Sequence, residues 1–225
     1  MTRVSAQSAS YIKTDLSQTA LAGLRVPLER ALSAGGIILF PTETFYGLAV
    51  DAHDLKAVEK LERLKGGRVD KNFPLIAESM AALEQIARLP EAFVPLAQRF
   101  WPGPLTFSLK PLVDLPAGVV SVRGEIGVRV SSHLGAKHVA HCAGGLITAT
   151  SANFAGDKPC LEMADVSEAL LDAVDLVIDT GPCAGGAPST IVGFENGEGV
   201  LWREGAISLD DLHACTDIHF RSSGG

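Results

Sequence analysis

Short apolar runs alternate along this chain with longer segments in which apolar positions recur at helical spacing. The runs predict buried strands, because a few consecutive apolar residues bounded by turn residues are typical of a strand covered on both faces. An edge strand is expected near Tyr11 and Ile12. The other predicted strands cover residues 37–40, 73–77, 105–109, 119–122, 126–130, 146–150, 176–178, 190–194 and 200–202.

The longer segments predict helices between these strands. Asp54 stands where an N-cap opens a helix, and the apolar residues of 55–64 fall at every third position and form one stripe. Ser79 opens another helix after the 73–77 strand, and the glycine pair 35–36 ends the first helix. The predicted helices cover residues 21–32, 55–64, the segment after Ser79, 91–100, 136–142 and 163–171.

The order of these elements predicts the fold class. Strands and helices alternate, but several neighbouring strands have connections too short for a parallel crossover. We therefore expect a single α/β domain with a twisted sheet of mixed parallel and antiparallel strands and flanking helices. The domain is expected to span residues 19–215, with a flexible N-terminal arm over 1–18 and a C-terminal tail over 216–225.

Composition narrows the classes of protein that fit. The chain has 225 residues, is 47% hydrophobic, and has 19 basic against 26 acidic residues, for a net charge of -7. This size supports one buried core. The acidic balance argues against a broad nucleic-acid-binding face and is compatible with a local basic pocket. We find no apolar stretch of the roughly 20 residues that a membrane span needs and no apolar signal core. The four cysteines form no CxxC pair, which favours reduced thiols and a cytoplasmic location.

A polar cluster follows the first buried strand. Thr42, Glu43, Thr44 and Tyr46 lie within five positions, and Gly47 allows a close backbone approach. Hydroxyls at the end of a buried strand in an α/β sheet are where small polar substrates usually bind. The alternative interpretation is a strand exit whose side chains satisfy local backbone groups.

A cationic loop lies between the second helix and the 73–77 strand. Lys65, Arg68 and Lys71 fall within seven residues, next to Gly66 and Gly67. Such a loop can wrap an anion, and phosphate is the natural candidate. Neither a GxxxxGK[ST] loop nor a GxGxxG fingerprint occurs in the chain. The alternative is a solvated charged turn.

Single polar residues mark the ends of other strands. Ser151 and Asn153 follow the 146–150 strand, and Arg203 leaves the last predicted strand. Arg129 lies inside an apolar strand, where a charge is seldom buried unless it is paired or bound to a ligand. Each of these positions also has a purely structural interpretation, such as an Asn-stabilised turn.

Taken in order, the segments PTETFYGL, KGGRVDK, WPGPLT, GVRV, TSAN, PSTIV and WREGAI resemble the YrdC/Sua5 family of threonylcarbamoyl-AMP synthases. The resemblance covers roughly residues 21–208. It implies an α/β fold with a large, concave, positively charged cavity. It also implies a nucleotidyl transfer in which L-threonine, bicarbonate and ATP give threonylcarbamoyl-AMP and pyrophosphate. The product would pass to the machinery that makes the t6A37 modification of tRNA.

The resemblance also implies roles for particular residues. The residues expected to bind L-threonine are Thr42, Thr44, Tyr46, Arg129 and Ser189. Those expected to bind ATP are Lys65, Lys71, Thr106, Ser151, Asn153 and Arg203, and the expected catalytic residues are Lys65, Arg68 and Lys71. Mg2+ is expected to enter with ATP, held by phosphates and water rather than by a protein cage. No protein metal site is expected, since His138 and His141 supply only two ligands at helical spacing.

The chain departs from the family pattern at three places. Gly67 stands at the usual arginine position and Arg68 follows it, Ser131 replaces a common proline, and Ala155 replaces a serine. One alternative is therefore a paralogue of the same fold that binds nucleotide or RNA without synthase activity. The other is the carbamoyl-transfer relative within hydrogenase-maturation proteins, which would require zinc-finger-like CxxC segments that this chain lacks.

Overall fold

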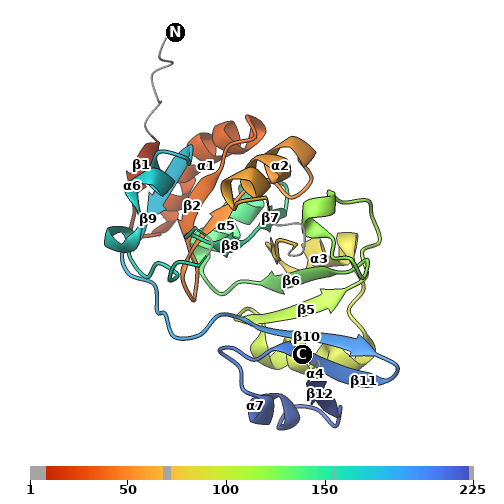
Figure 1. Ribbon diagram of the computed structural model, residues 1–225. Helices are drawn as coiled ribbons and strands as arrows, with labels where there is room; N and C mark the ends of the chain where they lie inside the picture. The colour runs from red at the N-terminus through yellow and green to blue at the C-terminus, as the bar shows by residue number, and fades with distance from the viewer. Residues whose placement is uncertain (1–8, 68–71, 155, 223–225) are drawn as a thin grey trace.

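The computed structural model describes residues 9–67, 72–154 and 156–222. Its strands form two sheets, one of five strands in the order β1-β9-β2-β3-β8 and one of seven in the order β12-β11-β10-β5-β6-β4-β7 (Figure 1). The strands are β1 (Ser10–Lys13), β2 (Ile38–Pro41), β3 (Tyr46–Ala49), β4 (Leu75–Ala77), β5 (Leu105–Leu109), β6 (Ile126–Val130), β7 (Leu146–Thr148), β8 (Thr150–Ser151), β9 (Leu176–Asp179), β10 (Thr190–Glu195), β11 (Glu198–Arg203) and β12 (Phe220–Ser222). The helices are α1 (Gln18–Ser33), α2 (Leu55–Leu64), α3 (Met80–Ile86), α4 (Val94–Phe100), α5 (Leu134–Cys142), α6 (Glu168–Leu171) and α7 (Leu209–His213).

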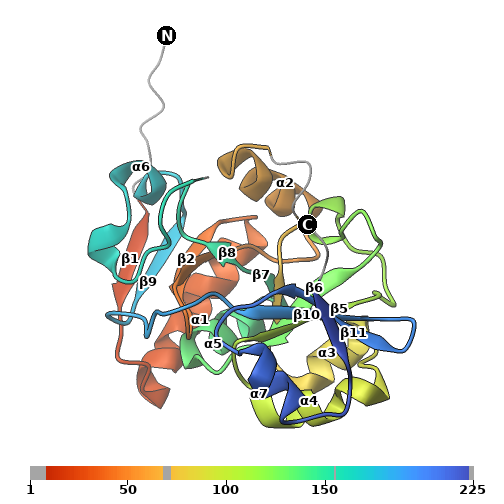
Figure 2. The ribbon, with the colours of Figure 1, turned by 60° about the horizontal axis from the view of Figure 1, so that its bottom comes forward.

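Both sheets mix parallel and antiparallel pairs, as the sequence predicts for the fold class. In the first sheet β2 runs antiparallel to β3 and parallel to β9. In the second sheet β5 runs antiparallel to β6 and parallel to β10. The connection from β9 to β10 carries the chain from one sheet to the other (Figures 1 and 2).

Alternating side chains of the central strands feed two hydrophobic cores. Along β2, Ile38 and Phe40 pack with α1 and α5, whereas Leu39 faces the larger core, which also contains α2 and strands β5 and β6. This is the period of two that a strand covered on both faces imposes. The two faces together explain why the sequence of β2 is continuously apolar rather than alternating.

The predicted helix caps are confirmed. The Asp54 carboxylate accepts hydrogen bonds from the Lys56 and Ala57 amides at the start of α2. The Ser79 hydroxyl accepts one from the Ala82 amide at the start of α3. These side chains satisfy backbone donors that the first helical turn leaves without partners.

The predicted strand over residues 146–150 is instead two short strands. β7 pairs with β4 in the seven-stranded sheet, and β8 pairs with β3 in the five-stranded sheet. Between them the Ala149 amide donates to the Pro74 carbonyl, 2.7 Å away, which extends the β4–β7 pairing by one residue before Thr150 pairs with Leu48 of β3. The chain therefore changes sheets here, which places the residues after Thr150 at the junction of the two sheets.

The predicted strand over residues 119–122 is wrong. Its first residue ends a 3-10 turn (Ala117–Val119), and Val122 is 94% exposed. Val119 is buried in the core and Val120 packs against it, and the following residues form a turn in which the Gly124 amide donates to the Ser121 carbonyl. An apolar run forms a strand only where a neighbouring strand can pair with it. Among the described residues, no strand pairs with this run.

Several elements were not predicted. β3 begins at Tyr46, the last residue of the polar cluster, and α7 and β12 lie beyond the last predicted strand. The predicted 163–171 helix is a 3-10 turn (Met163–Asp165) followed by α6. The segment assigned to the N-terminal arm includes β1, which confirms the expected edge strand, and the segment assigned to the C-terminal tail includes β12. Among the described residues, no helix is both long and apolar enough to cross a membrane.

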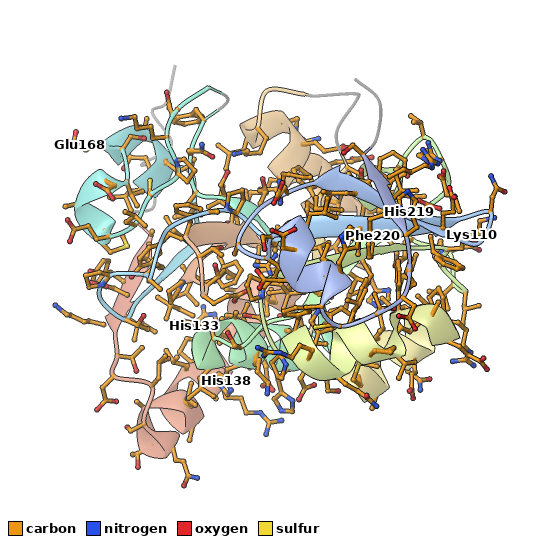
Figure 3. The ribbon with its side chains drawn as sticks, turned by 90° about the horizontal axis from the view of Figure 1, so that it is seen from below. Lys110, His133, His138, Glu168, His219 and Phe220 are labelled. Carbon is orange, nitrogen blue, oxygen red and sulfur yellow. The ribbon has the colours of Figure 1, made fainter. Side chains whose placement is uncertain are left out.

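The last strand is held mainly by Phe220. Its ring is 4% exposed, belongs to the larger core, and lies 5.8 Å from the His213 ring of α7 (Figure 3). β12 runs parallel to β11, and a side chain at Gly199 would collide with the Phe220 ring. Phe220 therefore anchors the end of the seven-stranded sheet.

Phe220→Ala should lower the free energy of unfolding by about 3 kcal/mol, because it removes a buried ring and leaves a cavity beside β11. Urea unfolding followed by circular dichroism measures this change. The control is Ser222→Ala, an exposed position on the same strand, which should change the free energy of unfolding by no more than about 0.5 kcal/mol. Equal effects of the two substitutions would show that Phe220 is not the anchor.

Candidate functional site

A cavity of about 840 Å³ lies where the two sheets meet. Its wall is built from the loop between β2 and β3, the end of α2, the crossing between β7 and β8, the strand β6, and the segments that lead into β10 and out of β11. Most of the residues that the sequence predicts for the site line this one cavity. They are Thr42, Thr44, Tyr46, Lys65, Arg129, Ser151, Ser189 and Arg203.

Of the other four predicted residues, two are described and do not line the cavity wall, and two lie outside the described residues. Thr106 is fully buried behind Ser189, and Asn153 lies behind Ser151. Both contact wall residues and so support the wall rather than form it. Arg68 and Lys71 lie outside the described residues, and so does the departure at position 155.

The loop after β2 is held by the hydroxyl of Thr42. This oxygen accepts hydrogen bonds from the Thr44 and Phe45 amides, each 3.2 Å away, and donates to the Phe45 carbonyl at 2.7 Å. The hydroxyl of Thr42 is therefore used within the loop, as the alternative interpretation of this cluster predicts. Its role is to present Thr44 and the following residues at the cavity.

Gly47 lines the cavity where β3 packs against β8 and β2. A Cβ atom there would lie 3.2 Å from the Thr150 carbonyl oxygen and 3.3 Å from the Phe40 ring. Glycine therefore allows the close approach of these strands, and a larger residue would require them to shift by a few tenths of an ångström.

Tyr46 directs its hydroxyl away from the cavity into a buried network. The hydroxyl donates to Asp179 at 3.1 Å or to the Gly181 carbonyl at 2.8 Å, and the side chain is fully buried. Burial raises the pKa of Tyr46 above its usual value, and the charge of Asp179 adds to the shift. Tyr46 therefore lines the cavity with its apolar part and fixes the start of the β9–β10 connection with its polar end.

Asp179 is the centre of this network. Its carboxylate accepts hydrogen bonds from the hydroxyls of Tyr11 and Tyr46 and from the Gly181 amide. Burial would raise the pKa of Asp179, but the bonds from Tyr11, Gly181 and Tyr46 outweigh it and hold the pKa below its usual value. The hydrogen bond to Asp179 in turn raises the pKa of Tyr11 to about 12. Asp179 was not predicted as a site residue. It stands at the end of an apolar strand, which is the same position that marked Ser151 and Arg203 as candidates.

Arg129 and Glu43 form a buried ion pair at the wall. Arg129 Nε lies 2.9 Å from Glu43 Oε1, and the two side chains are 7% and 11% exposed. Burial would raise the pKa of Glu43, but the Arg129 charge and the Ser131 hydroxyl hold it below its usual value. The pairing explains how Arg129 is tolerated in an apolar strand, as the sequence analysis requires.

Lys65 closes the end of α2 against the β8 loop. Its ammonium donates to the Ser151 carbonyl at 3.0 Å and to the Asn153 side-chain oxygen at 3.1 Å, and it also contacts the Asn153 carbonyl. The predicted loop cation and the predicted Ser-x-Asn segment are thus in direct contact. Of these residues, Lys65 and Ser151 line the cavity, and Asn153 holds both of them through its side-chain oxygen.

Ser189 has a hydroxyl whose two acceptor positions are both used. It accepts hydrogen bonds from the Thr106 hydroxyl at 2.9 Å and from Arg203 Nη2 at 3.1 Å. Arg203 also donates to the Ser189 carbonyl through Nε and Nη2. A serine hydroxyl has one donor and two acceptor positions. Its proton is therefore left for a ligand acceptor in the cavity.

Aromatic and charged groups give the cavity two kinds of surface. Trp202 lines it beside Arg203, and the guanidinium of Arg123 lies 4.5 Å from the centre of the Trp202 ring. The charged residues on the described wall are Lys65, Arg129, Arg203 and Glu62. The predicted positive charge of the cavity stays a prediction, because Glu43 offsets Arg129 and two of the predicted cations are outside the described residues. The sequence analysis missed Trp202 as a wall residue.

Comparisons with known proteins agree with this geometry. A family model described as "Telomere recombination", for Sua5, YciO and YrdC, matches residues 30–205. A threonylcarbamoyl-AMP synthase of Pyrococcus abyssi is 32% identical over 179 residues, which are 79% of this chain and 53% of that protein. One of Xanthomonas axonopodis pv. citri is 32% identical over 75% of this chain and 91% of that protein. The crystal structure of P. abyssi Sua5 complexed with L-threonine matches with a TM-score of 0.84 and 27% identity, covering 96% of this chain and 63% of that chain.

These coverages differ between the relatives. The chain spans about half the length of the P. abyssi relative. It spans nearly all of the Xanthomonas one. In both alignments the matched part is most of this chain.

Asp179→Asn should lower the free energy of unfolding at pH 7 by about 1–3 kcal/mol, because a charged acceptor of three hydrogen bonds is lost. The folded-state pKa of Asp179 is depressed, so its contribution is present above the unfolded pKa and is lost as the pH falls through the folded value. The difference in the free energy of unfolding between parent and variant should therefore narrow below about pH 4. Urea unfolding at a series of pH values measures this difference. The exposed substitution Asp172→Asn should show neither the loss nor the pH dependence.

Proposed function

Because the chain belongs to the Sua5/YciO/YrdC family, we propose that it is an L-threonylcarbamoyladenylate synthase. The reaction would join L-threonine, bicarbonate and ATP into threonylcarbamoyl-AMP and pyrophosphate, which makes the protein a nucleotidyltransferase. The observation that carries the proposal is the convergence of Arg129, Ser189 and Lys65 on one cavity at the junction of the sheets. The comparison with P. abyssi Sua5, which binds L-threonine, supports it.

The amino-acid end of the cavity is assigned to the β2–β3 loop, β6 and the start of β10. Arg129 would bind the carboxylate of L-threonine, since a guanidinium offers paired donors that match a carboxylate. The Ser189 proton, which has no acceptor among the described residues, would donate to the same substrate. Thr44 would supply a hydroxyl beside it.

The nucleotide end is assigned to the region around Lys65. The Lys65 ammonium, together with Ser151 and Asn153, would bind the phosphates of ATP, and Arg203 would contact the departing pyrophosphate. Lys71 and Arg68 are expected to add to this charge.

The chemistry requires positioning more than acid–base catalysis. The amine of threonine would attack CO2 derived from bicarbonate and lose a proton to give a carbamate. A carbamate oxygen would then attack the α-phosphorus of ATP, and the bond from this phosphorus to the oxygen that bridges the α- and β-phosphates would break to release pyrophosphate. Such transfers depend mainly on alignment and on stabilisation of charge. The convergence of cations and hydroxyls supports this type of catalysis.

Mg2+ would accompany ATP in this proposal. Among the described residues no group of three or more His, Cys, Asp or Glu side chains is arranged to hold a metal ion. Glu62 is the one carboxylate on the described wall of the cavity. The residues present therefore fit an ion held mainly by phosphate and water oxygens, whose chemistry is to neutralise the phosphate charge.

The cellular setting is part of the same proposal. The product would be passed to the transferase machinery of the t6A modification, with weak direct tRNA binding at most, because the net charge is -7. We propose a cytoplasmic location, which the four free cysteines support.

The proposal is tested by measuring pyrophosphate release from ATP with Mg2+ and bicarbonate while the twenty amino acids are supplied one at a time. Release that requires both L-threonine and bicarbonate is expected. ATP binding without such release would instead identify a paralogue that has the fold and lacks the synthase activity.

Lys65→Ala should reduce L-threonine-dependent pyrophosphate release at least about 100-fold, because a cation proposed to lie next to the transferred group is lost. Lys56→Ala is the matched control, since Lys56 is an exposed lysine on the same helix. Both variants should unfold within about 0.5 kcal/mol of the parent. Full turnover in Lys65→Ala would remove this lysine from the active site.

A further inference from the structure

We propose that Ser131 is a positioning residue for the amino-acid substrate. Its hydroxyl holds the carboxylate of Glu43, and this carboxylate fixes the guanidinium of Arg129 at the cavity wall. The inference rests on the proposed function, since it takes the ligand of Arg129 to be the carboxylate of an amino acid.

Ser131 makes two contacts that tie different elements together. Its side chain is fully buried at the end of β6, and its hydroxyl donates to Glu43 Oε2 in the β2–β3 loop. The same oxygen accepts a hydrogen bond from the His133 amide, 3.1 Å away. His133 lies at the N-terminal end of α5, where its ring accepts from the Gly135 amide (Figure 3). Ser131 thus connects the β2–β3 loop to the start of α5.

Glu43 links Ser131 to Arg129. One carboxylate oxygen accepts from Ser131, and the other accepts from Arg129 Nε at 2.9 Å. Among the described residues, the side chain of Arg129 makes its hydrogen bond through Nε alone, so both terminal nitrogens are available to a ligand. A guanidinium held at Nε presents its two outer donors in a fixed direction, which suits a bidentate carboxylate.

Without the Ser131 hydroxyl, the second oxygen of Glu43 would be buried with no side-chain donor. A buried acceptor that loses its partner is costly, and the carboxylate would rotate to regain one. Arg129 would follow Glu43 and would present its outer nitrogens in a less favourable direction. The substrate carboxylate would then bind more weakly, although no group that touches it has been removed.

Ser131→Ala should raise the KM for L-threonine about 10-fold and change kcat by less than about 2-fold, since the interaction concerns binding of the substrate. The KM for ATP should stay within about 2-fold of the parent. Steady-state pyrophosphate release and calorimetric binding of L-threonine measure these effects. If Ser131→Ala does not fold, Ser131→Cys, with similar volume and a weak donor, is expected to show the same rise.

The control is Ser108→Ala. The Ser108 hydroxyl donates to Glu125 Oε2 at 2.7 Å between β5 and β6, so it is a serine–carboxylate bond of the same kind outside the cavity. The substitution Ser108→Ala should leave the KM for L-threonine unchanged.

The pH profile separates positioning from a general loss of stability. Groups that face Glu43 are Arg129 and Ser131, His133 at the start of α5, and Cys183 in the β9–β10 connection. Removal of Ser131 takes away one of the interactions that keep the pKa of Glu43 low, so burial should raise that pKa towards the assay range. The KM of Ser131→Ala should therefore rise further as the pH falls from about 8 to about 5.5, where the parent stays nearly flat.

His133 is the second titratable ring near Glu43, and burial lowers its pKa while the charge of Glu43 opposes the shift. His133→Asn keeps an N-cap acceptor and removes the ring. The acid-side rise in KM should persist in the double variant Ser131→Ala, His133→Asn.

The outcomes distinguish this inference from the proposed function. Absence of L-threonine binding and of L-threonine-dependent release in the parent would overturn the proposed function and the inference with it. A working parent in which Ser131→Ala and Ser108→Ala give the same KM at every pH would overturn the inference alone. A selective rise in the KM for L-threonine with the acid-side dependence would support it.

Discussion

The ion pair between Glu43 and Arg129 joins the two sheets at the point where the cavity forms. Glu43 belongs to the loop that closes β2 and β3, and Arg129 belongs to β6 of the other sheet. Each charge would be costly to bury alone, so each depends on the other being present. The pair lies at the junction of the two sheets, where the chain also crosses from β7 in one sheet to β8 in the other. A cavity at such a junction draws its wall from segments far apart in the sequence.

The fold could be predicted where local patterning and tertiary packing agree. The apolar strand β2 and the cap at Asp54 are examples, because burial on both faces and helix capping each leave a direct mark in the sequence. Prediction failed where the outcome depended on a distant partner. Residues 119–122 are mostly apolar but pair with no strand in the described part of the chain. Residues 146–150 divide between two sheets, because Ala149 still bonds to Pro74 beside β4 whereas Thr150 pairs with Leu48 of β3. Such choices depend on the assembled sheets, and a local window cannot contain them.

The functional site, like the fold, could be predicted only in part. The types and order of its residues could be predicted, and the structure brings eight of them to one cavity. What could not be predicted is which groups face the ligand and which support those that do. Thr106 looked like a ligand-binding residue and lies behind Ser189, whereas Glu43 looked like a loop residue and holds Arg129, 86 positions away. Position 131, noted as a departure from the family pattern, carries the hydroxyl that completes this contact.

Gly47 has a consequence for how this protein can change over time. A side chain there would contact the Thr150 carbonyl and the Phe40 ring at 3.2–3.3 Å, so it would change the spacing of the strands around the cavity by a few tenths of an ångström. A substitution at Trp202, by contrast, would change the shape of the cavity wall directly. The same cavity can therefore be altered in two ways, through the spacing of its strands at Gly47 or through the side chains that line its wall.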